Sequence, residues 1–407
     1  MRRSTSAIVS KVVAPLSDSI RRNLGEGWST KRYYIEYRLL SNHLAHGVVA
    51  LARLGASDNL IEEFAAKYAE KLEPASSAPD YHDAHGKITS FDPSLLGQRK
   101  NYYELLSFYE GEINKNGSDV TISTFLPLLH QGLAGAAFHG AIHLGYGYAA
   151  QVDEIIAEGL AYLHFCYVPL YTENSNSTSS YSENQIEKTN RSESSTFEDY
   201  AATFTSMLET LQTDADLYRQ VEEGKTMFKD TGLSTFQRAI MALSHNDNGA
   251  SLYKYTDPLP NCGDTMWIVD LMLQLYVRTC TENSSDFFLL HGVTSSWALA
   301  QVSHLLQLSQ RSELHRSLEN ALFAAYVVQG CPPIENPLLS LQSKKLSWSW
   351  DDIVSNTLQN VQNDEHVFKL VEIARERASS NEAHVSDEIC REAAIRVGKL
   401  EFRFAGI

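Results

Sequence analysis

The stretch YYIEYRLLSNHLAHGVVALARLGA, residues 33–56, has the spacing of apolar side chains that is typical of a buried α-helix. Its apolar residues recur at intervals of three or four, so a helix over this stretch would gather them on one face. That face would consist of Ile35, Leu39, Leu40, Leu44, Val48 and Leu51. We therefore expect a helix here that packs against other helices.

The same periodicity returns along most of the chain. Residues 266–280, 288–308 and 317–330 have the apolar content of buried helices, and residues 364–378 have an apolar face opposite a charged one. Residues 118–124, SDVTIST, are the one modest alternating run of the kind found in β-strands. The pattern predicts a mainly α protein folded as a single large helical domain.

Two segments fall outside this pattern. Residues 172–196, TENSNSTSSYSENQIEKTNRSESST, have almost no apolar side chains, so burial cannot offset the entropy lost on ordering, and we expect a disordered surface insert. We expect residues 1–30 to form an N-terminal arm and residues 31–407 to form the domain. The arm has no acidic residue before Asp18, which fits either a frayed end, the interpretation we favour, or a weak organelle-targeting segment.

Charge and cysteine usage restrict the class of protein. The 407 residues include 50 acidic and 34 basic ones, for a formal charge of −16, which argues against nucleic acid as a partner. No apolar run is long enough for a membrane span, so we expect no membrane partner. The five cysteines are scattered without a CxxC pair, as in proteins of reducing compartments, and we expect a cytoplasmic protein.

Two histidines stand four positions apart in AAFHGAIHLGYGYAA, residues 136–150. On a helix, His139 and His143 would share one face and could direct two nitrogens at one metal ion. The glutamate that follows the first histidine in zinc proteases is replaced by Gly140, so the general base of that motif is missing. A packed, hydrogen-bonded pair is the alternative.

Further histidines lie in apolar surroundings. His43 and His291 fit either a metal ligand or a core histidine with one satisfied hydrogen bond, and His46 could replace His43 as a ligand. The other histidines are expected away from such a site: His304 packed, His82 and His85 solvated in a polar loop, and His366 on an exposed helix face.

Other catalytic patterns are weak. GYGYAA, residues 145–150, matches G-x-G-x-x-A but follows no Val/Ile-rich strand, so the context of a dinucleotide-binding fold is absent. The chain has neither a P-loop nor a G-x-S-x-G motif. Glu158 stands at the start of an apolar helix, where it could stabilise the helix end or orient a histidine.

Four stretches together resemble the questin oxidase-like family. They are SNHLAHGVVALARLGAS (41–57), FLPLLHQGLAGAAFHGAIHLGYGYA (125–149), AEGLAYLHFCY (157–167) and DEHVFKLV (364–371). The resemblance spans roughly residues 35–375, and FHGAIHLGYG is its most specific part. Members are mainly helical, and several open the rings of anthraquinone- or xanthone-type polyketides by oxidation.

The resemblance implies one of two kinds of site. One is a Baeyer–Villiger-type oxygenation that depends on NADPH. The other is a non-haem Fe2+ centre held by four histidines and a carboxylated lysine. The positions that match on this chain are His43, His139, His143 and His291, with Lys369 as the lysine and the catalytic group.

Spacing alone would place Lys369 on the surface, because Glu365 and Glu372 lie four residues before it and three after it on one helix face. The chemistry that the resemblance implies needs a buried lysine instead. Desolvation lowers the pKa of an amine, and the free amine can add carbon dioxide to become an anionic oxygen ligand. Four imidazoles and a carbamate suit Fe2+, although imidazole also binds copper, nickel and zinc.

We therefore expect an oxygenase that cleaves a ring of a flat aromatic polyketide with molecular oxygen. The candidates for stacking on the substrate are Tyr102, Tyr103, Tyr146 and Trp297, which could equally be core aromatics. The alternatives are a metal-free, NADPH-dependent Baeyer–Villiger monooxygenase and a non-catalytic helical binding protein. A metal centre requires that the ring nitrogens of the four histidines converge on one point.

Overall fold

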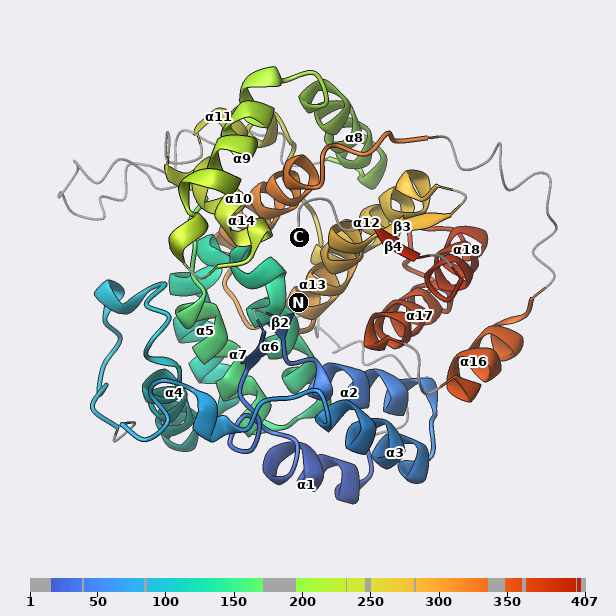
Figure 1. Ribbon diagram of the computed structural model, residues 1–407. Coiled ribbons are helices and arrows are strands. Elements are labelled where there is room, and N and C mark those ends of the chain that lie inside the picture. Colours follow the sequence, from blue (N-terminus) through green and yellow to red (C-terminus); the bar gives the residue numbers. More distant parts are fainter. Residues whose placement is uncertain are drawn as a thin grey trace, which may run out of the picture.

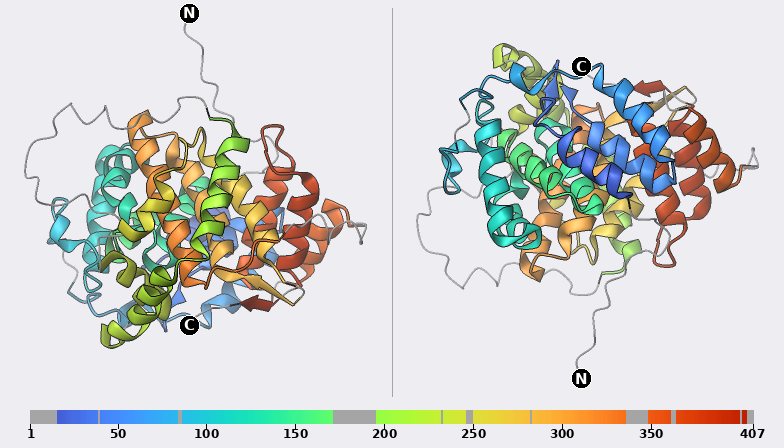
Figure 2. Two further views of the ribbon diagram at one scale, coloured as in Figure 1. Left: turned by 90° about the horizontal axis from the view of Figure 1, so that it is seen from above. Right: turned by 90° about the horizontal axis from the view of Figure 1, so that it is seen from below.

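The computed structural model describes residues 16–38, 40–83, 86–170, 195–231, 233–245, 250–281, 283–335, 348–360, 364–399 and 401–403. Helices dominate this part of the chain, and its two sheets have two strands each. Figure 1 shows the helices gathered in one body, and Figure 2 shows the C-terminal helices (red) on the side opposite the cyan and teal ones. The prediction of a mainly α, single globular domain is confirmed.

Four helices form a closed ring through their mutual contacts, and Figure 1 shows α6 and α13 near the middle of the view, with α2 below them and α17 to their right. They are α2 (Leu44–Leu54), α6 (His139–Ala150), α13 (Phe287–Ser303) and α17 (Glu365–Ala378). Helix α6 packs against α2 and α13, and α17 packs against the same two helices from the other side. The helical periodicity of the sequence therefore corresponds to a bundle whose axis is enclosed on all sides.

The four helices of this ring run in the same direction. Near their amino-terminal ends, the side chains of the helices meet through histidines. About two to three turns further toward the carboxyl-terminal ends, side chains of the same four helices meet again. There Trp297 contacts Arg53, Tyr146 and Glu376. Because both levels join the same four helices, their amino-terminal ends, and with them the positive ends of four helix dipoles, lie at one place.

The other helices surround this bundle. They are α1 (Asp18–Glu26), α3 (Asp58–Ala69), α4 (Tyr102–Asn116), α5 (Ser118–Leu129), α7 (Asp153–Phe165), α8 (Phe197–Leu211), α9 (Ala215–Met227), α10 (Thr235–His245), α11 (Ala250–Thr256), α12 (Thr265–Thr279), α14 (Leu308–Val328), α16 (Trp350–Gln359) and α18 (Asp387–Val397). The short 3-10 helices are η1 (Ala75–Ser77), η2 (Pro93–Leu95), η3 (His130–Gly132), η4 (Gly135–Phe138) and η6 (Lys229–Thr231). Helix α7 packs along α6, and α12 packs along α13. None of the described helices is long and apolar enough to cross a bilayer.

The helix predicted from residue 33 begins only at Leu44. The residues before it form the antiparallel pair β1 (Glu36–Tyr37) and β2 (Leu40–Ser41), with Arg38 at a φ of 48° in the turn. The Asn42 side chain accepts a hydrogen bond from the backbone N–H of Leu44 at 3.0 Å, which starts the helix there. The second sheet is parallel and pairs β3 (Ser284–Asp286) with β4 (Glu401–Arg403).

The one strand-like run is also helical, because SDVTIST forms the first turns of α5. The buried residues of α5 are Thr121, Ile122, Phe125, Leu126 and Leu129, which is a helical spacing that continues beyond the run. The seven residues of SDVTIST are too few to distinguish this helical spacing from the alternation of a β-strand.

The expected arm of residues 1–30 contains a packed helix, α1. Ile20 and Leu24 of α1 are buried, and α1 packs against α3 and α7. Their four-residue spacing is that of a helix face, and the Ser17 hydroxyl caps the helix by accepting from Ile20 N–H at 3.2 Å. Residues 1–15 lie outside the described residues. So does the expected insert, except for Ser195 and Thr196, and Thr196 caps α8.

Candidate metal centre

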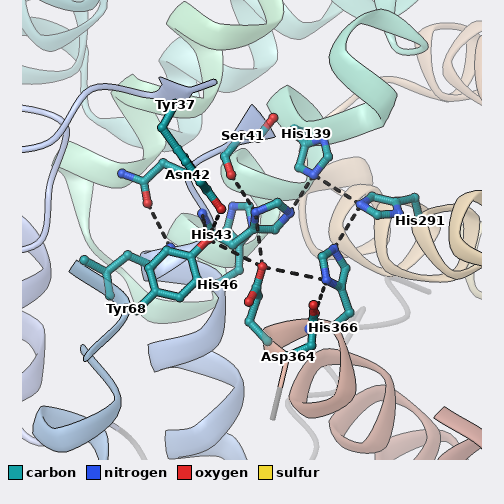
Figure 3. A network of polar contacts seen from close by, with 12 residues as sticks. Tyr37, Ser41, Asn42, His43, His46, Tyr68, His139, His291, Asp364 and His366 are labelled. Atoms are coloured by element: carbon teal, nitrogen blue, oxygen red, sulfur yellow. Dashed lines mark hydrogen bonds and ion pairs between the residues drawn. The ribbon is translucent and has the colours of Figure 1, made fainter. Parts of the chain in front are cut away.

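Four buried histidines from the ring of helices direct their Nε2 atoms at one place (Figure 3). The Nε2 atom of His139 lies 2.6 Å from that of His43 and 3.1 Å from that of His291. The Nε2 atom of His291 lies 3.2 Å from that of His366. Nitrogens bound at about 2.1 Å to one metal ion stand about 3 Å apart in neighbouring coordination positions. The four-histidine cluster, defined by these residues, therefore has the spacing of a metal site.

The other ring nitrogen of each histidine donates to an acceptor. These Nδ1 contacts are His43 with the Ser41 carbonyl (2.7 Å), His291 with the Phe287 carbonyl (2.8 Å), His139 with the Ala136 carbonyl, and His366 with the Asp364 carboxylate. A proton on Nδ1 leaves the lone pair on Nε2, which is the tautomer of a metal ligand held by outer acceptors. Four lone pairs that face one another repel unless a cation lies between them.

Local backbone structure sets the position of these rings. His43 is the N-cap of α2, and His139 is the first residue of α6. The turn before His139 is left-handed at three successive residues, with φ of 45° at Ala136, 51° at Ala137 and 68° at Phe138. This conformation costs L-residues roughly 1–2 kcal/mol each. Because the Ala136 carbonyl is also the acceptor for His139, the strained turn fixes the direction of that ring.

Burial favours the neutral form of three histidines of the cluster. Desolvation lowers the pKa of His43, His139 and His291 well below the ordinary value, and Lys369 and the neighbouring histidines lower it further. Neutral imidazole is the form that binds metal ions, since protonation removes the lone pair.

Lys369 is fully buried on α17, one turn beyond His366, and its Nζ has no hydrogen-bond partner among the described residues. Desolvation lowers its pKa to about 8, although Glu365 and Asp364 raise it. The solvated position that spacing alone favours is wrong. Glu372 pairs with Arg53 instead, at 2.5 Å. The lysine is therefore buried, as the chemistry implied by the resemblance needs, and its role as a ligand stays a prediction.

His143, expected as the fourth histidine of the site, lies in a neighbouring pair. Its Nε2 donates to Glu158 at 2.8 Å, and its Nδ1 accepts from His46 Nε2 at 3.0 Å. Both of its nitrogens therefore have partners. Four residues of helix rise about 6 Å, which moves His143 one turn below His139, to the level of His46. The expected role of Glu158 in orienting a histidine agrees with this contact.

His366 takes the fourth place in the cluster, and the exposed helix face expected for it is wrong, since the residue is buried. The acidic neighbours Asp364 and Glu365 suggested solvent, yet they contact the cluster: Glu365 Oε1 lies 3.5 Å from His43 Nδ1. The sequence did contain a signal that His366 belongs to the cluster. It precedes Lys369 by three residues and so shares the helix face of that lysine.

The expected substrate-stacking residues form two separate pairs. Tyr146 and Trp297 pack inside the bundle with ring centroids 4.8 Å apart. Tyr102 and Tyr103 both donate to Thr30, at 3.0 and 2.8 Å. All four are buried, and their role in substrate binding stays a prediction.

One aromatic residue that the sequence did not single out touches the cluster. The Phe287 ring lies 4.3 Å from the His291 ring and 4.7 Å from the His366 ring, between centroids. Phe287 is the first residue of α13. Its contact with His366 of α17 depends on how the two helices pack, which the sequence does not show.

Three further predictions concern residues outside the cluster. His304 is exposed, not packed, and contacts Tyr148 at 3.4 Å. His82 is exposed, as expected, whereas His85 lies outside the described residues. GYGYAA lies inside α6, and its glycines allow close helix packing: a Cβ on Gly145 would stand 2.4 Å from Ala298 Cα.

These features define a helical protein with a buried histidine site. A sequence profile of the questin oxidase-like family matches residues 40–373, more than half of the chain. The chain belongs to this family.

Three relatives are similar over shorter segments. The chain is 29% identical over 136 residues to the Baeyer-Villiger monooxygenase dmxR6 of Cryptosporiopsis sp., a segment that covers 30% of this chain and 28% of that protein. It is 31% identical over 135 residues to the Baeyer-Villiger oxidase mdpL of Emericella nidulans, covering 30% and 29%. It is 31% identical over 130 residues to the Baeyer-Villiger oxidase AgnL3 of Paecilomyces divaricatus, covering 29% and 27%. Less than a third of each relative is therefore matched.

Proposed function

We propose that this protein is a metal-dependent oxygenase that opens a ring of an aromatic polyketide, with oxygen entering beside a ring carbonyl so that a carbon–carbon bond breaks. The observation that carries the proposal is the four-histidine cluster, in which each Nδ1 donates to an acceptor and each Nε2 faces the centre. The names of the family and of the relatives support an oxidation.

The ion would be held by His43, His139, His291 and His366. Bound Fe2+ would supply the electrons that activate molecular oxygen. The residues of the chain hold the imidazoles in one tautomer and exclude water, since the four ligands are buried. Phe287 gives the cluster an apolar aromatic neighbour, against which a flat substrate ring can lie.

Lys369 would complete the site as a carbamate. Its neutral amine adds carbon dioxide, forming a carbon–nitrogen bond and releasing one proton. Two features favour the anionic product: the burial that lowers the pKa of the amine, and the four helix amino termini that meet at this place. The anion would partly balance the charge of the metal.

The test is elemental analysis of protein purified without a metal-binding tag, comparing His366→Ala with His143→Ala. About one equivalent of iron is expected in the wild type, and a large loss only in His366→Ala. Oxygen consumption with an anthraquinone should follow the iron content. Equal loss of metal in both variants, or no metal in the wild type after anaerobic supply of iron, would contradict the proposal.

A second candidate is a metal-free, NADPH-dependent Baeyer–Villiger oxidation, which the names of the relatives favour. It predicts NADPH oxidation and substrate turnover in protein stripped of metal by a chelator. The first proposal predicts that stripped protein is inactive until iron is restored.

A further inference from the structure

A second group of polar side chains lies inside the bundle, below the four-histidine cluster. Four of its atoms are buried and have no hydrogen-bond partner among the described residues: His46 Nδ1, Tyr146 Oη, Lys369 Nζ and Glu372 Oε2. They come from three facing helices, α2, α6 and α17. Buried polar atoms are normally hydrogen-bonded, so unpaired atoms in one region indicate bound polar molecules.

The four side chains are linked in pairs. The His46 and Tyr146 rings stack with centroids 5.4 Å apart. Lys369 and Glu372 lie three residues apart on one face of α17, about 4.5 Å along the helix axis. The charge of Glu372 acts on the Tyr146 hydroxyl, and that of Lys369 acts on His46. The set therefore extends from the cluster down the bundle axis.

The chemistry of these atoms suits water. Because His46 Nε2 donates to His143, its Nδ1 is an acceptor, as is Glu372 Oε2. Lys369 Nζ and Tyr146 Oη can donate. A buried water molecule needs two to four polar partners of both kinds, and this group offers them.

The lower end of the group reaches the surface through an ion-pair network. Arg53 Nε donates to Glu372 Oε1 at 2.5 Å, and Arg53 Nη2 donates to Glu376 Oε2 at 2.5 Å. Trp297 Nε1 donates to the same Glu376 oxygen at 3.1 Å. The Arg53 and Glu376 side chains are 12% and 13% exposed, whereas Glu372 is 3% exposed. Glu372 thus has one oxygen on the surface side and one oxygen inside that lacks a hydrogen-bond partner within the described ranges.

We propose that these four atoms line a hydrated compartment, and that Glu372 carries protons between this compartment and solvent. The Glu372 carboxyl group gives its proton to the compartment, becomes a carboxylate, and regains a proton from solvent at the Arg53–Glu376 end. No electron moves in this step. The use of these protons in ring oxygenation rests on the function proposed above, whereas the carrier itself does not.

The environment of Glu372 suits a carrier. Burial raises its pKa to about 7, Glu376 raises it as well, and Arg53 lowers it. The groups that face it are Arg53 on α2, Tyr146 on α6 and Glu376 on α17, and α13 contributes the Trp297 indole, which binds Glu376. A group that exchanges protons works best when its pKa lies near the working pH.

Infrared spectroscopy of metal-free protein tests the carrier directly. A carboxylic C=O band should disappear with a midpoint near pH 7, shift in D2O, and be absent in Glu372→Gln. Glu376→Gln should lower the midpoint, because it removes a negative neighbour, and Arg53→Met should raise it. Glu158→Gln, a buried carboxylate outside the compartment, should leave the band unchanged. A band that persists in Glu372→Gln would overturn the proposal.

Turnover of the iron-loaded enzyme tests what the protons are used for. Glu372→Gln should lower kcat roughly 10- to 100-fold, the low end of acid–base effects, with KM nearly unchanged. The dependence of kcat on pH near 7 should vanish in Glu372→Gln, and Glu372→Asp should restore part of this dependence. Wild-type kcat and pH profile in Glu372→Gln would show a purely structural carboxyl and overturn the proposal. If wild-type protein opens no quinone ring while the band titrates as expected, the proposed function fails and the proton carrier stands.

Discussion

The Nε2 atoms of His139 and His43 lie 2.6 Å apart, although the two residues are 96 positions apart in the sequence. Each ring has its other nitrogen held by a backbone carbonyl, so neither can turn away without losing a buried hydrogen bond. The fold therefore holds two lone pairs together. A cation between them removes the repulsion and links metal binding to folding stability.

Metal addition should stabilise the protein for this reason. A ligand that binds only the folded state stabilises it by about 4 kcal/mol at a thousandfold excess over its Kd. We expect Fe2+ or Zn2+ to raise the Tm of chelator-treated protein by several degrees. His366→Ala should abolish the rise, and His304→Ala, which changes an exposed histidine, should keep it. The same rise in both variants would place the metal elsewhere.

Acid should destabilise the protein even without metal. Burial lowers the pKa of His130 and of His315 from 6.5 to about 4. The unfolded chain therefore binds more protons, and stability falls as the pH drops from 6.5 toward 4, by roughly 3 kcal/mol for each histidine at most. Urea unfolding between pH 7 and 5 should show this loss. His315→Gln should reduce the slope by about one proton, and His304→Gln should not change it.

The left-handed turn before His139 stores strain that a glycine would relieve. Ala137→Gly should raise the free energy of unfolding by about 0.5–1 kcal/mol, because glycine adopts a φ of 51° freely. Ala141→Gly, inside α6, should lower it by about 1 kcal/mol. Urea unfolding of the two variants checks the difference in sign. Destabilisation in both would show that Ala137 is not strained.

Close packing of α6 against α13 should be intolerant of a methyl group. A Cβ on Gly145 would meet Ala298 backbone atoms at 2.4 Å, so Gly145→Ala must push the helices apart and move His139 relative to His291. We expect a loss of 1–3 kcal/mol, as for overpacked cores, and weaker metal binding. Gly111→Ala, in α4 with open space around it, should be neutral or stabilising. Calorimetry and metal titration distinguish the two variants.

The sequence predicts the helices well and the site in part. Buried helices such as α12 and α14 follow from periodicity because their apolar faces are long. Periodicity also predicted a helix over residues 33–43, which is wrong. The positive φ at Arg38 makes a turn there, and no glycine in the sequence indicates that turn.

The assignment of ligands depended on information that spacing does not contain. His139 and His143 share a helix face, yet the cluster forms at the ends of four helices, so only the first histidine of the pair reaches it. His366 and Lys369 have the sequence surroundings of a solvated helix. Their burial depends on the packing of α17 against α2 and α13, which is a tertiary property.

Lys369 provides the most demanding prediction. Its amine is buried and has no hydrogen-bond partner in the described part of the chain, and burial lowers its pKa to about 8, which leaves a usable fraction of free amine near neutral pH. Lys369→Arg should abolish metal-dependent oxygen consumption with an anthraquinone, because guanidinium stays protonated and cannot become an anionic ligand. Lys369→Glu should restore part of the metal content, since it supplies a carboxylate on a shorter stem. Added bicarbonate should increase iron binding by the wild type and leave both variants unchanged. If Lys369→Arg keeps wild-type metal content and turnover, the centre is held by histidines alone and the lysine serves only the interior of the bundle.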